Sequence, residues 1–330
     1  MQRRGGDELF REILVNSRRP MIPVDRLIAA DCGRTTFDRD ALFQEESMTD
    51  CQPKQHARCT IVEHRLVGHQ TFLLTVEAGT LADRFLPGQF VMVRLADAQD
   101  PLLGRALAIY DRRRSTADQP GTLSVVYSVK GKFTQALARL LPGQIVQLWG
   151  PLGNAFATDP VETLYLAAGG VGHTPMLSLM RQSLGLDRYG DSSTPAPWAT
   201  RVVFCYGARS ASGFSCLEDF SALPVDLRLA TEDGTKGMRG RVTEALTAAI
   251  QEYGTERSRV ACCGPEPMME AVAQLAAQHA MRCQVSLETP MACGIGICFT
   301  CVAKVGTPSD WDYRRTCIEG PVFDADQVVW

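Results

Sequence analysis

The sequence predicts a multidomain protein that combines an all-β domain with an α/β domain and ends in a small cysteine-rich domain. Three observations predict this organisation: closely spaced β-type segments over 56–155, alternating β-type and helical segments over 160–287, and a cysteine- and glycine-dense segment of little regular pattern over 288–330. Two or three domains are expected for a chain of 330 residues. Residues 1–55 are charged and aperiodic, and we expect a poorly ordered extension there.

The extension has two interpretations. Met48 stands just before the organised sequence, so translation could begin there. Otherwise the chain carries a genuine N-terminal extension. The sequence leaves both open.

The segment 56–155 predicts an antiparallel barrel or sandwich. Six runs are rich in β-branched, aromatic or apolar residues, and turn signals such as Pro87-Gly88 and Pro142-Gly143 separate them. The expected strands are 59–67, 71–78, 89–96, 105–111, 122–129 and 144–150. One helix is expected over 134–141.

The segment 160–287 predicts a parallel sheet covered on both faces, because strands and helices alternate at short spacing. The expected strands are 163–169, 201–207, 226–232, 259–264 and 282–288. The expected helices are 175–184, 215–220, 242–250 and 267–279.

Bulk properties limit the function. The formal net charge is −3, with no clustered basic patch of the kind that nucleic-acid binders carry. No apolar run reaches the roughly 18 residues that a membrane span needs, and the polar start is unlike a secretory signal. We therefore expect a cytoplasmic protein that does not bind nucleic acid and has no membrane span. In such a chain, 12 cysteines indicate metal binding or catalysis rather than disulfides.

Four cysteines near the C-terminus have the spacing C-x4-C-x2-C with 15 residues before the fourth. They are Cys293, Cys298, Cys301 and Cys317. This is the plant-type 2Fe-2S spacing, in which a compact loop wraps the cluster and a distant residue supplies the last thiolate. Gly294 and Gly296 would let the loop turn tightly around the inorganic sulfides. The alternative is structural zinc, but only Cys298 and Cys301 form the C-x2-C knuckle that zinc sites usually repeat.

A glycine-rich turn, GGVGHTP, follows the first strand of the α/β segment and opens a helix. Gly169, Gly170 and Gly172 would allow a pyrophosphate close to the backbone, and Pro175 suits a first helical turn. The motif lacks the G-x-G-x-x-G spacing, and its glycines could serve the turn alone. Cys263, Gly264 and Pro265 end another parallel strand, so both motifs should face the same sheet edge. Cys263 could also be a buried structural thiol.

These motifs resemble those of the ferredoxin-NADP reductase superfamily, in which the barrel holds FAD and the α/β domain holds the nicotinamide cofactor. The segments MACGIGICFTC and RTCIEGPVFDADQVVW narrow the resemblance to the electron-transfer subunits of NAD-linked dihydroorotate dehydrogenases. The resemblance runs from about residue 56 to the end. It implies an antiparallel FAD-binding barrel over 56–155, a parallel α/β nicotinamide-binding domain over 160–287 and a 2Fe-2S domain over 288–330.

The resemblance also implies the flavin contacts. They are Arg105, Ala106, Leu107, Ala108, Val126, Tyr127, Ser128, Gly131, Phe133 and Thr134. Arg105 would pair with the FAD pyrophosphate, and Thr134 would open a helix whose N-terminus faces phosphate. Two residues depart from the family pattern: Ala108 replaces a serine that contacts the flavin, and Phe133 replaces a glycine. Taken alone, Arg105 would be a surface charge and Thr134 a helix cap.

The implied protein is an oxidoreductase subunit with FAD, a 2Fe-2S cluster and NAD(H). Cys263 would lie near the reacting nicotinamide carbon. A separate FMN-containing subunit would oxidise dihydroorotate in pyrimidine (UMP) biosynthesis, and two of each subunit would form a heterotetramer. Electrons would pass through the cluster and FAD to NAD⁺.

Two alternatives stay open. The chain could be another diaphorase of the superfamily, such as a hydrogenase diaphorase subunit, or an iron-sulfur subunit that has lost FAD and does not turn over. The apolar ending VFDADQVVW could dock a partner, cap the flavin, or pack against its own domain. The choice between NADH and NADPH is undecided.

Overall fold

The computed structural model describes residues 55–190 and 196–330. They belong to one compact unit, Pro53–Trp330. The expected N-terminal extension up to residue 54, and with it Met48, lies outside the described residues.

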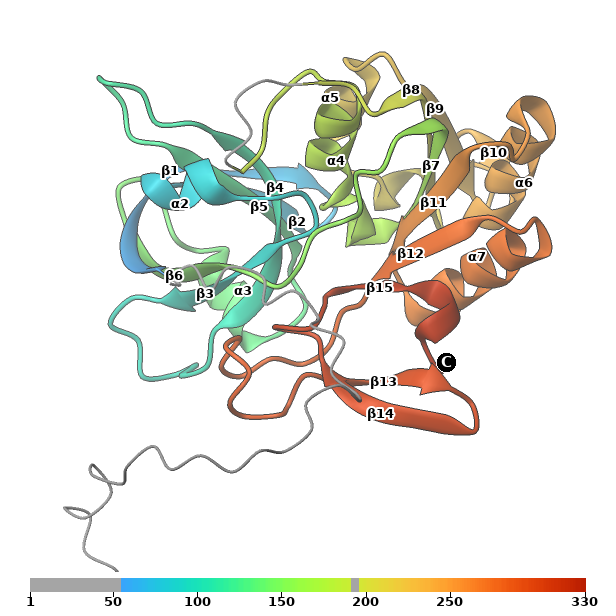
Figure 1. The fold of residues 1–330 in the computed structure, drawn as a ribbon. Helices are drawn as coiled ribbons and strands as arrows, with labels where there is room; N and C mark the ends of the chain where they lie inside the picture. The colour runs from blue at the N-terminus through green and yellow to red at the C-terminus, as the bar shows by residue number, and fades with distance from the viewer. Residues whose placement is uncertain (1–54, 191–195) are drawn as a thin grey trace, which may run out of the picture. The chain divides into compact units, whose positions relative to one another are not determined.

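The first domain is a closed antiparallel barrel, shown in blue to green in Figure 1, with strand order β1-β2-β5-β4-β3-β6. Its strands are β1 (Gln55–Gly68), β2 (Thr71–Glu77), β3 (Phe90–Leu95), β4 (Arg105–Arg113), β5 (Thr122–Ser128) and β6 (Ile145–Leu152). All six expected strands are confirmed. Two short helices accompany them, α2 (Thr80–Arg84) and α3 (Lys132–Leu137).

The barrel closes because the alternate residues of its strands are apolar and point inward. Ile61, Val91, Ile109 and Leu148 are each at most 1% exposed and belong to one core. Closure leaves no free strand edge in the barrel.

The second domain is a seven-stranded sheet of order β10-β9-β8-β7-β11-β12-β15. Its strands are β7 (Val161–Gly169), β8 (Ala199–Ala208), β9 (Asp226–Thr231), β10 (Met238–Arg239), β11 (Ser258–Cys263), β12 (Arg282–Ser286) and β15 (Val322–Asp324). Every pairing is parallel except that of β12 with β15. The five strands expected from the sequence are therefore confirmed, and β10 and β15 extend the sheet at its two edges.

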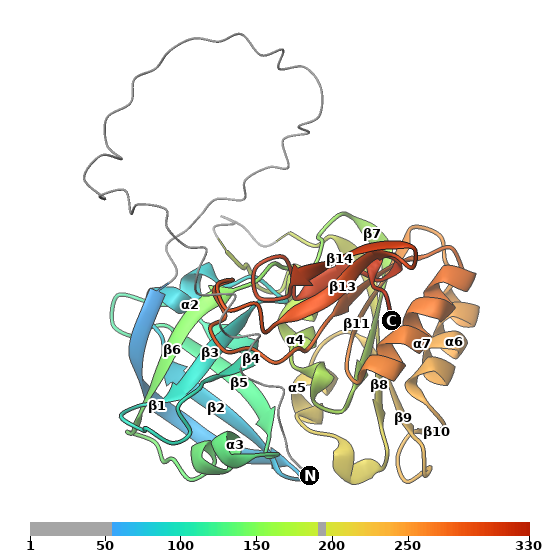
Figure 2. The same ribbon diagram turned by 90° about the horizontal axis from the view of Figure 1, so that it is seen from below.

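Helices cover both faces of this sheet, as expected. They are α4 (Met176–Ser183), α5 (Leu217–Ser221), α6 (Val242–Tyr253) and α7 (Glu266–Gln278). Figure 2 shows α6 and α7 together on one face, with α4 and α5 on the other. The two apolar cores on either side of the sheet contain the buried side chains of α4 and of α6 and α7, respectively. Because both faces of these parallel strands are buried, their sequences are nearly continuous apolar runs.

The C-terminal segment is more regular than its sequence indicates. Strands β13 (Val302–Thr307) and β14 (Asp310–Arg315) form an antiparallel hairpin, in red in Figures 1 and 2. The apolar ending then returns to the large sheet as β15, where Val322 and Phe323 are 3% and 7% exposed. The ending packs against its own domain, which favours that interpretation over a docking surface.

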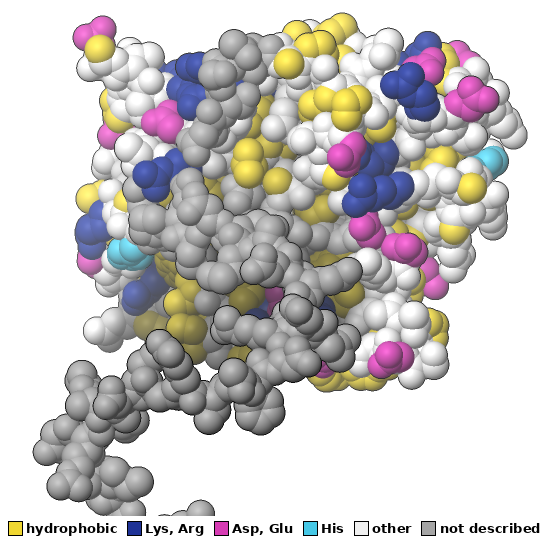
Figure 3. Space-filling model, in the orientation of Figure 1, with side chains coloured by type: hydrophobic (Ala, Val, Ile, Leu, Met, Phe, Trp, Pro, Cys, Tyr) yellow, Lys and Arg dark blue, Asp and Glu magenta, His cyan; other side chains and the backbone are white. Residues whose placement is uncertain are grey.

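The described surface in Figure 3 shows basic and acidic side chains interspersed, often side by side. Among the described residues, no helix combines the length and apolar character needed to cross a bilayer.

Candidate functional site

The two motifs expected at one sheet edge do meet there. Strands β7 and β11 are parallel neighbours, with Ala168 opposite Cys263. A Cβ atom on Gly172 would lie 2.3 Å from the Cys263 carbonyl oxygen, so only glycine allows the turn this close to the second motif. Gly170 has a φ of +54°, and a Cβ atom built on it would have no described atom within 4 Å, which leaves room for a ligand at the turn. The edge fits a dinucleotide beyond the strand ends.

The Cys263 thiol is neutral near pH 7. Burial, and to a lesser extent the nearby Glu288 carboxylate, raise its pKa to about 12, although a hydrogen bond with Ser286 opposes the rise. A neutral thiol can pack against a nicotinamide ring but is no nucleophile.

His173, inside the same turn, is fully buried. Its Nε2 lies 2.7 Å from the Ser215 hydroxyl, and its ring packs among Tyr110, Tyr206 and Phe220. Its Nδ1 has no hydrogen-bond partner among residues 55–190 and 196–330. Burial lowers the pKa of this imidazole to about 3, so the ring is a neutral packing group.

The expected flavin motif lies at the start of β4. Arg105 is exposed, and its Nη1 donates to the carbonyls of Leu103 and Gly104 at 3.3 and 2.9 Å. Within the described part of the chain, no carboxylate forms an ion pair with this guanidinium. A guanidinium without an acidic partner fits a pyrophosphate. Ala106, Leu107 and Ala108 follow, all half-buried.

Phe133, which departs from the family pattern, does not cover the barrel surface beside the flavin motif. The Phe133 side chain is 1% exposed and points into the barrel core, with the Arg105 guanidinium 5.6 Å from its ring centroid. The two segments that carry the expected flavin contacts are therefore adjacent. Thr134 caps the first turn of α3, where its hydroxyl accepts from the backbone N–H groups of Lys130 and Gly131.

The strand segment Val126–Ser128 has two faces. Tyr127 is buried inside the barrel, where its hydroxyl lies 2.8 Å from His64 Nε2. Val126 packs into the core shared with the α/β domain. Val126 and Ser128 therefore lie on the outer side of the strand, and of the two only the half-buried Ser128 is open to a ligand, because Val126 is 2% exposed.

The four cysteines of the C-terminal loop approach in two pairs. The Cys293 thiol is one of the groups that lower the pKa of Cys298, and the Cys301 thiol is one of those that raise the pKa of Cys317, so the members of each pair are close enough to interact. In the described ranges, no three His, Cys, Asp or Glu side chains are grouped as ligands of a single metal ion. A binuclear cluster takes two thiolates on each iron, which is the pairing seen here. Cys301 and Cys317 are buried, while Cys298 is exposed.

The cysteine loop packs directly on the barrel. The Trp149 indole N–H donates to the Cys293 carbonyl at 2.9 Å. A Cβ on Gly294 would lie 2.6 Å from Met92 Cγ. Cys301 and Cys317 share one apolar core with Met92 and Leu152, and Ala106 of the flavin motif packs against it. The cysteine loop and the flavin motif therefore meet in one core.

Thr300 bonds the sulfur of the exposed cysteine. Its hydroxyl accepts from the Ala292 N–H at 3.2 Å and lies 3.1 Å from Cys298 Sγ. A Cys298 thiolate has no proton to donate, so in that state the Thr300 hydroxyl is the donor to the sulfur. This contact is the largest of the hydrogen bonds that lower the pKa of Cys298 to about 6, and it favours the thiolate that iron binds.

Sequence reasoning missed these supporting contacts. Trp149 carries no sequence signal, since its partner is a backbone carbonyl 144 residues away. Thr300 could have been found, because a hydroxyl between two expected cluster ligands is near a sulfur in any compact loop.

Comparison with protein families gives three matches along the chain. The iron-sulfur cluster binding domain of dihydroorotate dehydrogenase B matches residues 288–329. An oxidoreductase NAD-binding domain matches 166–274, and an oxidoreductase FAD-binding domain matches 58–156.

Curated relatives cover most of the chain. An electron transfer subunit of dihydroorotate dehydrogenase B (NAD(+)) from Geobacillus kaustophilus is 34% identical over 82% of this chain and 98% of its own length. The corresponding protein of Desulforamulus reducens is 32% identical over 80% of this chain and 95% of its own.

Solved structures share the fold. The NADH-dependent reduced ferredoxin-NADP oxidoreductase, described in connection with flavin-based electron bifurcation, aligns with a TM-score of 0.68 at 23% identity, covering 83% of this chain and 90% of that one. The ferredoxin reductase of carbazole 1,9a-dioxygenase aligns with a TM-score of 0.57 at 18% identity, covering 70% and 68%.

The buried His173 predicts a specific loss of stability in mild acid. Its pKa is about 3 in the folded chain and about 6.5 when unfolded, so the unfolded state alone gains a proton as the pH falls between these values. The neutral His173 therefore contributes its full share to the free energy of unfolding above about pH 6.5. Below that pH, the free energy of unfolding declines by at most ~1.4 kcal/mol per pH unit towards pH 3. Urea unfolding gives the free energy of unfolding at pH 7 and at pH 5. The difference between these two values should be smaller for His173→Leu than for wild type. A His279→Gln variant, changed at an exposed histidine, should keep the wild-type difference. An unchanged difference in His173→Leu would contradict the assignment.

The Thr300 contact predicts a shift in cluster potential. Removing a hydrogen bond to a ligand sulfur disfavours the more negative, reduced cluster. Thr300→Val should lower the reduction potential by some tens of millivolts, equivalent to roughly 1 kcal/mol for a one-electron couple. A potentiometric titration followed by electron paramagnetic resonance measures it. Thr307→Val, in the β13–β14 hairpin, is the control. Equal reduction potentials for the two variants would contradict an effect of the Thr300 hydrogen bond on the cluster.

Proposed function

Because this chain belongs to the family of dihydroorotate dehydrogenase B electron transfer subunits, we propose that it carries electrons from dihydroorotate oxidation, performed by a separate FMN-containing subunit, to NAD⁺. The route passes through a 2Fe-2S cluster held by Cys293, Cys298, Cys301 and Cys317, and through FAD on the barrel. The reaction is a step of pyrimidine (UMP) biosynthesis.

One observation carries this proposal. The buried cysteines Cys301 and Cys317 share an apolar core with Ala106 of the flavin motif. When bound, FAD exchanges a hydride with NAD and single electrons with an iron-sulfur cluster, so it links the two carriers. The chain's own task is to hold the cysteine loop on the barrel and the nicotinamide-binding edge beside it.

Individual residues take roles in this proposal. Arg105 holds the FAD pyrophosphate, and Leu107 and Ala108 replace the missing serine with backbone groups. Gly169, Gly170 and Gly172 admit the NAD pyrophosphate to the turn. The neutral Cys263 thiol packs against the nicotinamide, with Gly264 and Pro265 shaping the edge beside it. The domains retain the proposed bounds 56–155, 160–287 and 288–330.

The catalytic partner docks at the cysteine loop in this proposal. Ile297 and Phe299 flank the exposed Cys298 and are themselves 74% and 59% exposed. Large apolar side chains this exposed are typical of an interaction surface. Electrons from the partner enter where the cluster ligands reach the surface. The complex contains two copies of each subunit.

The complex acts in the cytoplasm. Thiolate-held clusters and the NAD pool both belong to a reducing compartment.

The test is reconstitution with the FMN-containing subunit. Mixed anaerobically with that subunit, dihydroorotate and NAD⁺, the holo chain should form NADH, measured at 340 nm, and either subunit alone should not. A mixture that forms no NADH, although FAD and iron are present in full, would contradict the function.

Surface variants separate docking from chemistry. Ile297→Asp should lower NADH formation at least tenfold, because taking an unpaired charge out of water into an apolar interface costs roughly several kcal/mol. Direct bleaching of its flavin by NADH should be unchanged. Leu141→Asp is the matched control, since Leu141 is 66% exposed and precedes the turn before β6. Equal losses in both variants would place the docking surface elsewhere.

A further inference from the structure

A short segment of the α/β domain inserts into the barrel. Residues 187–190, which we call the strap, follow α4, and the Tyr189 side chain is only 2% exposed within the barrel core. Its ring meets Phe85 edge-on at 5.5 Å between centroids. The strap backbone also bonds the barrel, because the Gly190 N–H donates to the Phe85 carbonyl at 3.0 Å.

Strand β4 also contacts the strap, through the side chain of Arg112. The Arg112 side chain is 1% exposed and pairs with Asp187 at 3.4 Å. Its Nη2 donates to the Arg188 carbonyl, and its guanidinium lies 4.7 Å from the Tyr189 ring centroid. A buried arginine with an acid, a carbonyl and an aromatic face as partners is fixed in one orientation.

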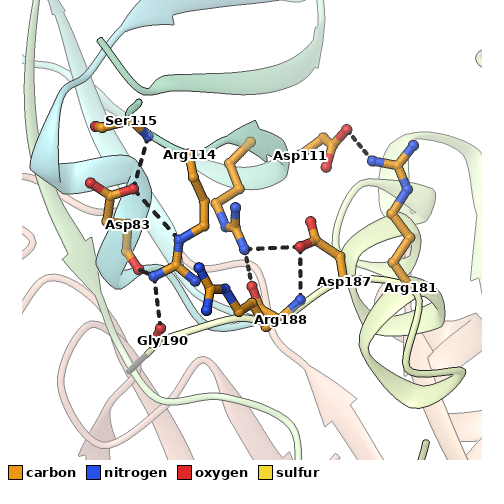
Figure 4. Close-up of polar contacts among 9 residues, drawn as sticks. Asp83, Asp111, Arg114, Ser115, Arg181, Asp187, Arg188 and Gly190 are labelled. Carbon is orange, nitrogen blue, oxygen red and sulfur yellow. Dashed lines mark hydrogen bonds and ion pairs between the residues drawn. The ribbon is translucent and has the colours of Figure 1, made fainter. Parts of the chain in front are cut away.

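A second ion pair joins α4 to β4. Arg181 Nη1 lies 2.5 Å from Asp111 Oδ2, and the two side chains are only 30% and 22% exposed. Figure 4 shows them pointing toward one another from α4 and the barrel, with Arg114 placed between Asp83 and Gly190.

The elements joined are the ones that carry the cofactor motifs. Strand β4 begins with Arg105 and ends with Arg113, so it holds the flavin motif at its start. Near its end lie Asp111 and Arg112, whose contacts with Arg181 and with the strap we call the clamp. Helix α4 begins directly after the turn that contains Gly172 and carries Arg181 in its last turn. The clamp therefore connects the flavin motif to the phosphate-binding turn through two rigid elements.

We propose that the strap, gripped by Arg112, and the Arg181–Asp111 ion pair are positioning elements that fix the phosphate-binding turn relative to the flavin motif for hydride transfer. The inference rests on the proposed function. Interfaces between domains of one chain allow relative motion by default. Hydride transfer tolerates little misplacement, and an error of about 1 Å can cost on the order of 10²-fold in rate.

The variants for the test are Arg181→Gln and Tyr189→Ala in the full chain with FAD and cluster bound. The limiting rate constant of flavin bleaching at saturating NADH is measured by anaerobic stopped flow. We expect both variants to slow it by about 10- to 100-fold. The affinity for ADP-ribose, which contacts the nucleotide edge alone, and the FAD and iron contents should stay at wild-type values.

Two controls separate positioning from general damage. Tyr189→Phe should bleach at the wild-type rate, because the Tyr189 hydroxyl has no hydrogen-bond partner in the described part of the chain. Arg228→Gln should also be normal, since Arg228 pairs with Glu252 at 2.6 Å and Asp226 at 2.7 Å within the α/β domain. If Tyr189→Ala fails to hold FAD, Arg181→Gln decides the matter.

The outcomes are distinct. Wild-type bleaching rates in Arg181→Gln and Tyr189→Ala would overturn the positioning role and leave the proposed function intact. A fall in ADP-ribose affinity that accounts for the slower bleaching would also overturn it, because the contacts would then shape the nucleotide site itself. If NADH does not bleach the flavin of the wild-type chain, the proposed function is overturned instead.

Discussion

Strand β4 is the constraint on which the rest of the structure depends. It is hydrogen bonded to β3 and β5 within a closed barrel, so it cannot shift without opening the barrel. Its first residues carry the flavin motif, and Ala106 packs against the core that contains Cys301 and Cys317. Its later residues, Asp111 and Arg112, contact the α/β domain. Strand β4 therefore contacts the segments that we propose as the sites of all three redox groups.

Burial distinguishes two edges of the proposed cluster site. Cys301 and Cys317 are 1% and 0% exposed and face the barrel, whereas Cys298 lies at the surface beside Ile297 and Phe299. One edge of the cluster site thus faces the flavin motif and the other faces solvent, where a partner can dock. The hydrogen bond from Thr300 lies on the exposed edge, where water would otherwise compete for the sulfur.

The sequence predicted the elements well because periodicity and turn residues are local properties. The six barrel strands, the five central strands of the large sheet and the meeting of Gly172 with Cys263 all follow from such patterns. The strap, Trp149 and β15 did not, because each depends on contacts between distant segments. Tyr189 sits in a loop that carries no apolar period, and β15 is only three residues long. The site residues for FAD and NAD remain predictions that the geometry supports.

The most direct test of the account is whether NADH reduces the cluster only through FAD. The purified chain would be stripped of FAD with its cluster retained, and the cluster's paramagnetic signal recorded after adding NADH and then dithionite. The account predicts no signal with NADH until FAD is restored, and a full signal with dithionite throughout. Equal reduction by NADH with and without FAD would contradict the serial path through the barrel.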